Sequence, residues 1–272
     1  MIKVLCSTGC LIGRPVKRNF YLLKDFIANI SCDGYELMFY NDWYEKSHEL
    51  TAFMNSLGIS VPSFHVEKRI GELLAEEKLD EALPLFEINC QCANGIGAKT
   101  LVLHLWNGII SDSNIRANYE AFGILNGMAK DYGLCLTVEN VVCNHLDPLT
   151  HLLELKRRYP DIRFTFDTKM AAFHSQIDDV FKEENRHLWQ NISHIHLNDY
   201  RGLHMDWSSL KTLHVGLGDI DFETFFENLK KIGYNGDFTV EATSFDQNGV
   251  IDFDLLNSSL EKVRQYAEKY GI

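Results

Sequence analysis

The chain has no apolar run that approaches the roughly 20 residues needed to span a bilayer. Its first residues, MIKVLCSTG, lack the basic flank and apolar core of a secretion signal. We therefore expect a cytoplasmic protein that is not associated with membranes.

Positive charge is also scarce, because 26 lysines and arginines stand against 38 aspartates and glutamates, for a formal net charge of −12. A negative surface repels phosphate backbones, so a nucleic-acid partner is not expected.

Paired CxxC motifs are also absent. The seven cysteines are an odd number and are scattered over the sequence, which favours a reducing compartment over a disulfide framework.

No long linker divides the 272 residues, and a chain of this length can bury a large core. We therefore predict a single domain over residues 1–272.

What the sequence does contain is an alternation of strand-like and helix-like segments, with a period of about 30 to 35 residues. The strand-like segments begin at Ile2, Tyr35, Ser60, Thr100, Leu134, Ile162, Ile192 and Phe238. Helical periodicity is clearest after Asp221, an expected N-cap, and stops at Gly233. Further helical patterns cover residues 113–132, 147–159, 254–270 and 70–95, and a break near Pro84 is possible in the last.

Eight strands that alternate with helices predict an α/β fold, a single (β/α)8 TIM barrel, with an open doubly wound sheet as the alternative. The doubly wound alternative would place a glycine-rich fingerprint after the first strand. STGCLIGRP has two glycines there at the wrong spacing, so the barrel is favoured.

Six side chains that can bind metals stand at the expected C-terminal ends of six of these strands, where barrel enzymes have their active sites. They are His65, His104, Glu139, Asp167, His196 and Glu241. Each alone is ordinarily a local hydrogen-bond partner or a helix cap. Together they would cluster buried acid, which is costly without a cation. We therefore predict a divalent metal, Zn, Mn, Co or Mg.

Three other histidines, His48, His151 and His187, lie in helical segments and are expected to face solvent.

Five motifs carry a family resemblance. They are VEN (138–140), FDT (166–168), HIHLND (194–199), GxGDIDF (216–222) and TVE (239–241). In this order they resemble the xylose isomerase-like TIM-barrel superfamily, which includes sugar and sugar-phosphate isomerases and epimerases, inosose-processing enzymes and endonuclease IV. The resemblance covers nearly the whole chain.

The resemblance implies a ligand set. Glu139, Asp167, His196 and Glu241 match the four ligands of the catalytic metal in ketose 3-epimerases. His65 and His104 match the histidines that endonuclease IV adds for a second metal. One ion is expected and two are possible.

One departure weighs against the nuclease. Met170 stands where both the epimerases and the nuclease have a histidine, and a thioether is a poor ligand for a hard ion. Asp206, His204 and His214 are also not at the spacing of the nuclease's Asp-x-His pair.

The implied function is a metal-dependent sugar or sugar-phosphate isomerase or epimerase that works through a metal-stabilised enediolate, with Glu139 and Glu241 as the acid/base pair. A related lyase or dehydratase would use the same chemistry. Candidate substrate contacts are Trp106, Asn107, Arg14, Lys169 and Arg201. The alternatives are an endonuclease IV-like dinuclear metal phosphodiesterase and a non-catalytic barrel that binds metal and sugar. A homodimer or a homotetramer is possible.

Overall fold

The computed structural model describes residues 2–246 and 248–272. Eight parallel strands form a closed barrel in chain order. They are β1 (Val4–Ser7), β2 (Gly34–Met38), β3 (Ser63–His65), β4 (Thr100–Leu103), β5 (Cys135–Glu139), β6 (Arg163–Asp167), β7 (Ile192–Leu197) and β8 (Asp237–Val240). The predicted TIM barrel is confirmed, and the doubly wound sheet is excluded.

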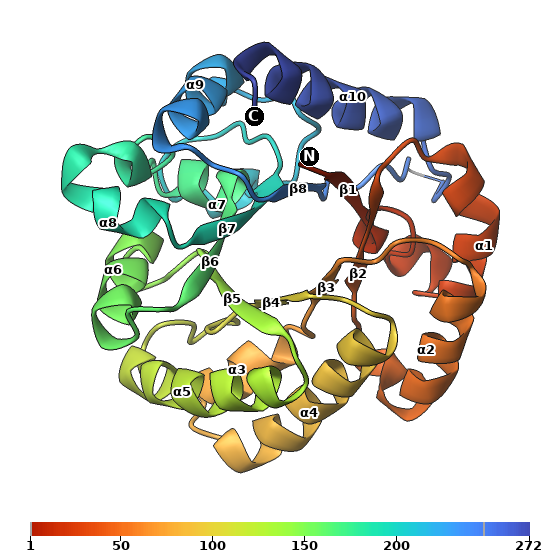
Figure 1. The fold of residues 1–272 in the computed structure, drawn as a ribbon, viewed down its shortest axis with the longest axis horizontal. Coiled ribbons are helices and arrows are strands. Elements are labelled where there is room, and N and C mark those ends of the chain that lie inside the picture. The colour runs from red at the N-terminus through yellow and green to blue at the C-terminus, as the bar shows by residue number, and fades with distance from the viewer. Residues whose placement is uncertain (1, 247) are drawn as a thin grey trace. The chain divides into compact units, whose positions relative to one another are not determined.

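Contacts divide the chain into two compact units, a middle unit (Glu36–Phe164) and a terminal unit (Met1–Tyr35 with Thr165–Ile272). In the middle unit, β3 pairs with β4 and β4 with β5, all in parallel. Its helices are α2 (Ser47–Ser56), α3 (Arg69–Ala75), α4 (Leu79–Gly95), α5 (Ile115–Asp131) and α6 (Pro148–Arg158). Figure 1 shows α3, α4 and α5 on the outer side of β3, β4 and β5.

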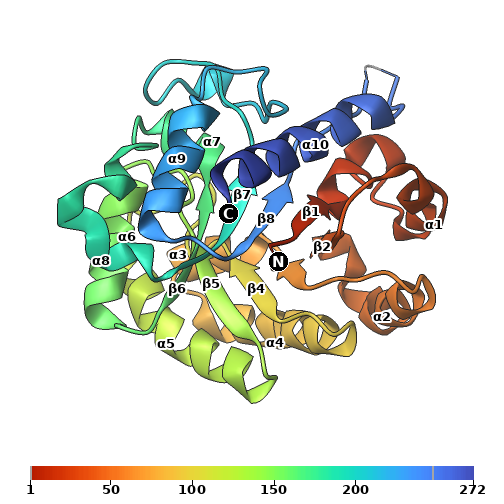
Figure 2. The same ribbon diagram turned by 45° about the horizontal axis from the view of Figure 1, so that its top comes forward.

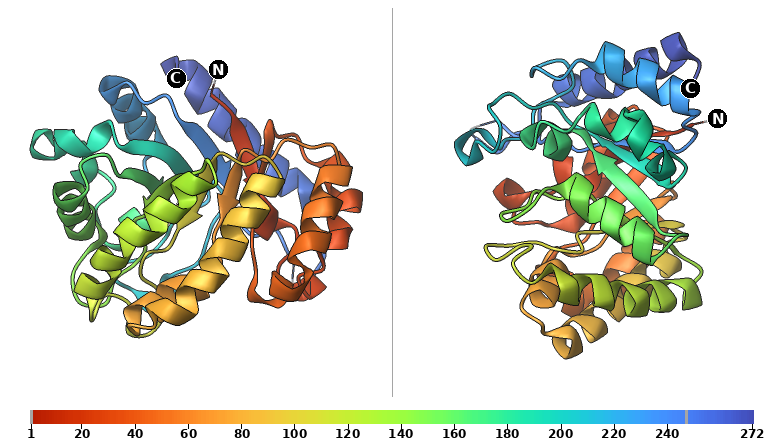
Figure 3. Two further views of the ribbon diagram at one scale, coloured as in Figure 1. Left: turned by 60° about the horizontal axis from the view of Figure 1, so that its bottom comes forward. Right: turned by 90° about the vertical axis from the view of Figure 1, so that its left-hand side faces the viewer.

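In the terminal unit, β1 pairs with β8 and β8 with β7. Its helices are α1 (Leu23–Phe26), α7 (Thr168–Phe173), α8 (Arg186–Trp189), α9 (Phe222–Ile232) and α10 (Phe253–Tyr270). Figure 2 shows α10 beside β8 and β1. The start of β1 and the end of α10 lie close together in both views of Figure 3. No helix in the described ranges is long and apolar enough to cross a membrane.

The start and the end of α9 follow the expected capping chemistry. Asp221 accepts a hydrogen bond from the backbone N–H of Thr224 at 3.1 Å, as an N-cap residue does. Gly233 ends the helix with a φ of 68°, a left-handed conformation that glycine adopts at little cost. The buried face holds Phe222, Phe225, Phe226 and Leu229, which confirms the helix predicted from periodicity.

The break predicted near Pro84 is wrong. Pro84 lies inside α4, and the chain instead breaks between α3 and α4, where Glu77 has a φ of 59°. A proline removes one backbone hydrogen bond from the helix. Here the buried face continues past it through Ala82, Phe86 and Cys90, so packing maintains the helix.

The GxGDIDF motif builds the loop between β7 and α9. The Asp199 carboxylate is fully buried and accepts hydrogen bonds from the backbone N–H groups of Tyr200, Gly216, Gly218 and Ile220, at 2.8–3.1 Å. A Cβ atom added at Gly218 would lie 2.2 Å from Asp199 Oδ1. Glycine is therefore required at 218 to let the loop close around this carboxylate.

We expect Gly218→Ala to lower the free energy of unfolding by about 1–3 kcal/mol, because the added methyl group displaces the Asp199 carboxylate. The matched control is Gly127→Ala in α5, where an added Cβ has nothing within 4 Å. That substitution should stabilise the protein by about 0.5–1 kcal/mol. Urea unfolding of the three proteins measures both effects. Equal stabilities for Gly218→Ala and the wild type would contradict this account of the loop.

Candidate metal centre

All six predicted metal ligands lie at the C-terminal ends of strands. His65, Glu139 and Asp167 are the last residues of β3, β5 and β6. His104 and Glu241 directly follow β4 and β8, and His196 is the penultimate residue of β7. The strand ends were thus placed correctly from the sequence.

In the middle unit, His65, His104 and Glu139 converge on one another. Their ligand atoms lie within 4.8 Å of each other. Glu139 Oε2 is 2.8 Å from His104 Nε2 and 3.3 Å from His65 Nε2. All three side chains are buried. Loss of hydration lowers the pKa of His104 to about 4, although the Glu139 carboxylate opposes the shift. His104 is therefore neutral near pH 7 and available as a metal ligand.

In the terminal unit, Asp167, His196 and Glu241 form a second group, with ligand atoms within 4.8 Å of one another. His196 Nδ1 is 3.5 Å from Glu241 Oε2. The side-chain N–H of Asn198 donates to Asp167 Oδ2 at 2.8 Å and lies 3.4 Å from Glu241 Oε2. One amide thus bridges the two carboxylates.

Glu241 Oε1 is buried and has no hydrogen-bond partner among the described residues. A buried carboxylate oxygen without a partner is costly, because burial removes its hydration. A divalent cation would satisfy this oxygen. Carboxylate and imidazole donors also suit Zn, Mn, Co and Mg. The residues of the terminal unit therefore fit a metal ion.

Local hydrogen bonds fix the orientation of Asp167. Its Oδ1 accepts the backbone N–H of Met170 at 2.7 Å and so caps α7. The next residue, Thr168, donates from its hydroxyl to the Asn198 carbonyl at 2.6 Å and accepts the Asn198 N–H at 3.0 Å. These bonds join the end of β6 to the segment that follows β7, and so hold Asp167 beside His196.

Two candidate substrate contacts lie just after His104. Trp106 is 0% exposed, packs its ring on His151, and donates from Nε1 to the Val141 carbonyl at 3.0 Å. In this conformation Trp106 offers no face to a sugar, and substrate contact would require this segment to rearrange. Asn107 is half-buried and lies 3.4 Å from His104 Nδ1 through its Oδ1. Contact of either residue with substrate stays a prediction.

The three cationic candidates lie in the terminal unit. Lys169 is half-buried and donates to Thr212 Oγ1 at 3.0 Å. Arg14 is exposed in the loop after β1. Arg201 is exposed and forms a surface ion pair with Asp219 at 3.3 Å, an arrangement that typically contributes about 0–1 kcal/mol. Their predicted roles in substrate binding are untested.

The expectation that His151 faces solvent is wrong, whereas His48 and His187 are exposed as predicted. His151 is fully buried on the inner face of α6 together with Leu152 and Leu155. Its Nε2 donates to Asp112 Oδ2 at 3.0 Å, and its Nδ1 accepts the Tyr119 hydroxyl at 2.7 Å. The helical spacing of 148, 152 and 155 contained this signal, because position 151 falls on the same face.

Asp112 holds the loop that follows Glu139. Besides His151, its carboxylate accepts three consecutive backbone N–H groups at 2.8–3.0 Å, those of Asn144, His145 and Leu146. Burial raises the pKa of Asp112, but these hydrogen bonds outweigh it and bring the pKa down to about 2. Sequence reasoning missed Asp112, because only the tertiary fold brings it to this loop.

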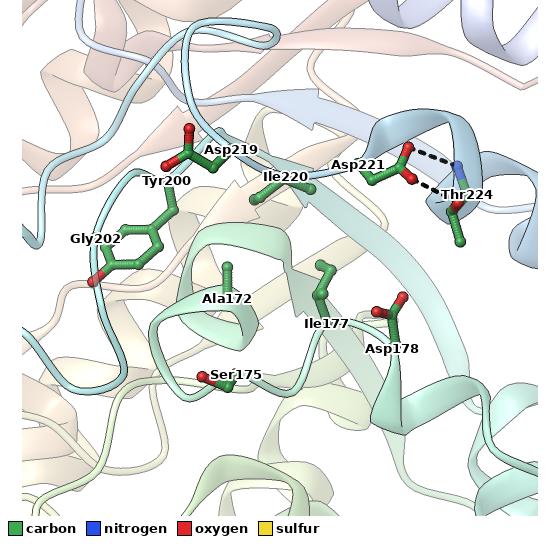
Figure 4. Close-up of a pocket in the computed structure, with 10 residues that line it drawn as sticks. All are labelled: Ala172, Ser175, Ile177, Asp178, Tyr200, Gly202, Asp219, Ile220, Asp221 and Thr224. Atoms are coloured by element: carbon green, nitrogen blue, oxygen red, sulfur yellow. Dashed lines mark hydrogen bonds between the residues drawn. The ribbon is translucent and has the colours of Figure 1, made fainter.

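A separate pocket of about 480 Å³ lies in the terminal unit, between α7 and the start of α9 (Figure 4). None of the six metal-ligand candidates lines it. Of its three aspartates, Asp221 caps α9 through Thr224, as the dashed lines show, and Asp219 pairs with Arg201. Two of its carboxylates are thus already engaged in local structure.

Comparison with known proteins identifies the family. A family model described as xylose isomerase-like TIM barrel matches residues 25–263. The chain belongs to this family. The sequence is 26% identical to an uncharacterized protein of Methanocaldococcus jannaschii, over 76% of this chain and 69% of that protein.

Solved structures of this barrel are similar to the whole chain. A D-tagatose 3-epimerase-like protein has a TM-score of 0.71 at 18% identity, covering 99% of this chain and 98% of its own. D-allulose 3-epimerase from Methylomonas sp. has a TM-score of 0.71 at 17% identity, with 97% and 98% covered. The IOLI protein with a bound zinc atom has a TM-score of 0.70 at 15% identity, with 99% of both chains covered. At these identities the likeness shows the shared fold.

We expect the stability contributed by His151 to depend on pH. Burial lowers its pKa below the ordinary value of 6.5. The unfolded state therefore binds a proton more readily, and this contribution is present above about pH 6.5 and lost as the pH falls below it. His151→Gln should cost about 1–3 kcal/mol near neutral pH, and its deficit relative to the wild type should shrink as the pH falls.

Urea unfolding of both proteins at several pH values measures this difference. The control, His48→Gln, changes an exposed position in α2 and should show no such trend. A deficit for His151→Gln that is independent of pH would contradict the buried neutral state.

Proposed function

We propose that this protein is a metal-dependent isomerase or epimerase of sugars or sugar phosphates. The observation that carries the proposal is the convergence of Asp167, His196 and Glu241, with a buried carboxylate oxygen of Glu241 that lacks a hydrogen-bond partner among the described residues. Structures of similar fold are sugar epimerases by name, and one contains zinc. These likenesses support the proposal through the fold.

The proposed ion is held by Glu139, Asp167, His196 and Glu241. These residues stand at the ends of β5, β6, β7 and β8, which are consecutive strands of the barrel. When bound, the divalent ion supplies a Lewis acid for a substrate carbonyl and the hydroxyl beside it. Zn, Mn, Co and Mg are the candidate ions.

The proposed acid and base are Glu139 and Glu241. One of the pair, as the carboxylate, removes the proton from the carbon beside the carbonyl, and the other, as the protonated acid, returns a proton. Return to the opposite face of the same carbon inverts that centre and gives epimerisation. Return to the neighbouring carbon interconverts aldose and ketose. Asn198 donates to both Asp167 and Glu241, so it would orient these carboxylates during the reaction.

All five proposed substrate contacts lie in segments that follow strands of the barrel. Lys169 lies two residues beyond Asp167, and its ammonium group is a cation for a substrate oxygen or phosphate. Arg14 and Arg201 are exposed guanidinium groups suited to a phosphate. Trp106 and Asn107 follow His104 directly.

A second ion, held by His65, His104 and Glu139, is the second part of the proposal. It is supported by the approach of both histidine Nε2 atoms to the same oxygen of Glu139, at 3.3 Å and 2.8 Å. Two ions also favour a second candidate function, a dinuclear phosphodiesterase of the endonuclease IV type. Met170 and the net charge of −12 oppose that candidate.

Metal content tests the ligand set. We expect zinc-reconstituted protein to hold one or two equivalents by elemental mass spectrometry. Glu241→Gln should lose one equivalent, because a neutral amide replaces a charged ligand. Glu268→Gln, at an exposed position on α10, is the control and should keep the full content. Wild-type protein that takes up no metal after reconstitution would refute the proposal.

Activity tests the chemistry. We expect the metal-loaded enzyme to convert members of a panel of ketoses, aldoses and their phosphates, and Glu139→Gln to lower kcat by about 10²- to 10⁴-fold, because the amide cannot exchange a proton. Glu268→Gln should retain wild-type kcat. Abasic DNA is assayed in parallel. Cleavage of DNA without conversion of sugars would favour the dinuclear phosphodiesterase, and metal binding without turnover of either would indicate a non-catalytic barrel.

A further inference from the structure

A further pocket lies wholly within the middle unit, and we call it the α3–α4 pocket. Its volume is about 440 Å³, and its lining comes from α3, from the first part of α4 and from the 3₁₀ helix Asn41–Lys46. The lining residues are Asn41, Tyr44, Arg69, Leu73, Glu81 and Leu85. None of the six metal-ligand candidates is among them. Small-molecule sites commonly have volumes of about 300–1,000 Å³, so this pocket has room for a small ligand.

The aromatic residue of this lining is held in place by buried polar groups. The Tyr44 hydroxyl donates to Glu67 Oε2 at 3.4 Å and accepts from Asn89 Nδ2 at 3.2 Å. Asn89 is fully buried and also donates to the Leu85 carbonyl at 2.8 Å, while its Oδ1 accepts the Glu67 N–H at 3.1 Å. These bonds fix the ring of Tyr44 and the helix turn at Leu85. The pocket is therefore formed before a ligand enters.

Two lining side chains of opposite charge are available to a ligand. Arg69 and Glu81 are both exposed. Over residues 2–246 and 248–272, neither the Arg69 guanidinium nor the Glu81 carboxylate forms a hydrogen bond or an ion pair, with the other or with a third residue. The nearby ammonium group of Lys78 is paired with Glu76 at 2.6 Å. The pocket thus presents one unpaired cation and one unpaired anion.

Most of the remaining lining is apolar. Leu73 is buried, and Leu85 and Tyr44 are half-buried. A guanidinium group binds a carboxylate through two parallel hydrogen bonds, and a carboxylate binds an ammonium group through charged hydrogen bonds. Leucine side chains and an aromatic ring remove hydrocarbon from water. A ligand that matches all three features carries a carboxylate, an ammonium group and an apolar side chain.

We propose that the α3–α4 pocket binds a free α-amino acid with an apolar side chain. Arg69 receives the α-carboxylate, Glu81 receives the α-ammonium group, and the apolar lining receives the side chain. A plain organic acid would leave Glu81 unmatched, and a plain amine would leave Arg69 unmatched, so both are disfavoured. The proposal concerns a site apart from the metal centre and does not rest on the proposed function.

The first measurement is a calorimetric titration of the full chain, without added metal, with L-leucine and with L-phenylalanine. We expect saturable binding. Three analogues of leucine each lack one recognised part: isocaproate lacks the ammonium group, isoamylamine lacks the carboxylate, and glycine lacks the apolar side chain. Each should bind about 10-fold or more weakly than leucine, because a charged hydrogen bond or an apolar contact is lost.

The second measurement assigns each charge of the ligand to its partner. Arg69→Gln should weaken the binding of leucine about 10- to 100-fold, but not that of isoamylamine, which has no carboxylate. Glu81→Gln should weaken the binding of leucine to a similar extent, but not that of isocaproate. The matched controls are Lys68→Gln and Asp80→Asn, which remove the same charges at exposed neighbouring positions outside the pocket and should bind leucine as the wild type does.

Three outcomes would overturn the proposal. The first is no saturable binding of either amino acid up to about 10 mM, a concentration that nearly saturates a site with a Kd of about 1 mM. The second is binding of leucine that Arg69→Gln and Glu81→Gln leave unchanged. The third is equal binding of leucine and isocaproate, which would assign the pocket to organic acids. None of them bears on the metal centre, because these titrations use neither metal nor sugar.

Discussion

The burial of carboxylates at the ends of neighbouring strands is the constraint on which the centre depends. In the middle unit Glu139 is surrounded by two imidazoles, and in the terminal unit Glu241 and Asp167 share one amide donor. Carboxylates placed this deep lose hydration that a few hydrogen bonds replace only in part. The free energy that the rest of the barrel gains on folding has to offset this cost, and a bound cation would reduce it.

The surrounding residues share one task, which is to hold these groups in fixed orientations. Thr168 links the end of β6 to the segment after β7. Asp199 accepts four backbone N–H groups of the loop after β7, and Asp112 accepts three of the loop after β5. In each case a buried polar side chain forms hydrogen bonds mainly with backbone groups. Loops held in this way have little conformational freedom. Such rigidity is what a metal site requires of the segments beside its ligands.

Most of the fold and the positions of the six ligand candidates could be predicted from the sequence. Apolar runs that end in His, Asp or Glu mark strand ends, and the turn and capping residues between them mark helices. The misjudged features depend on packing: Pro84 remains helical because its neighbours are buried, and His151 is buried because α6 turns that face inward. Asp112 was missed because its contact with Asn144 spans 32 positions of sequence and no local pattern links them.

The capping of α7 by Asp167 limits how this residue can hold an ion. One carboxylate oxygen already accepts the Met170 N–H that begins the helix, and the other accepts from Asn198. Each oxygen thus already accepts one hydrogen bond, and the two donors hold the plane of the carboxylate in one orientation. A carboxylate oxygen keeps a second lone pair beside such a bond, so a cation would meet Asp167 from a direction that the fold sets in advance. Formation of α7 and orientation of a proposed metal ligand are thus one event.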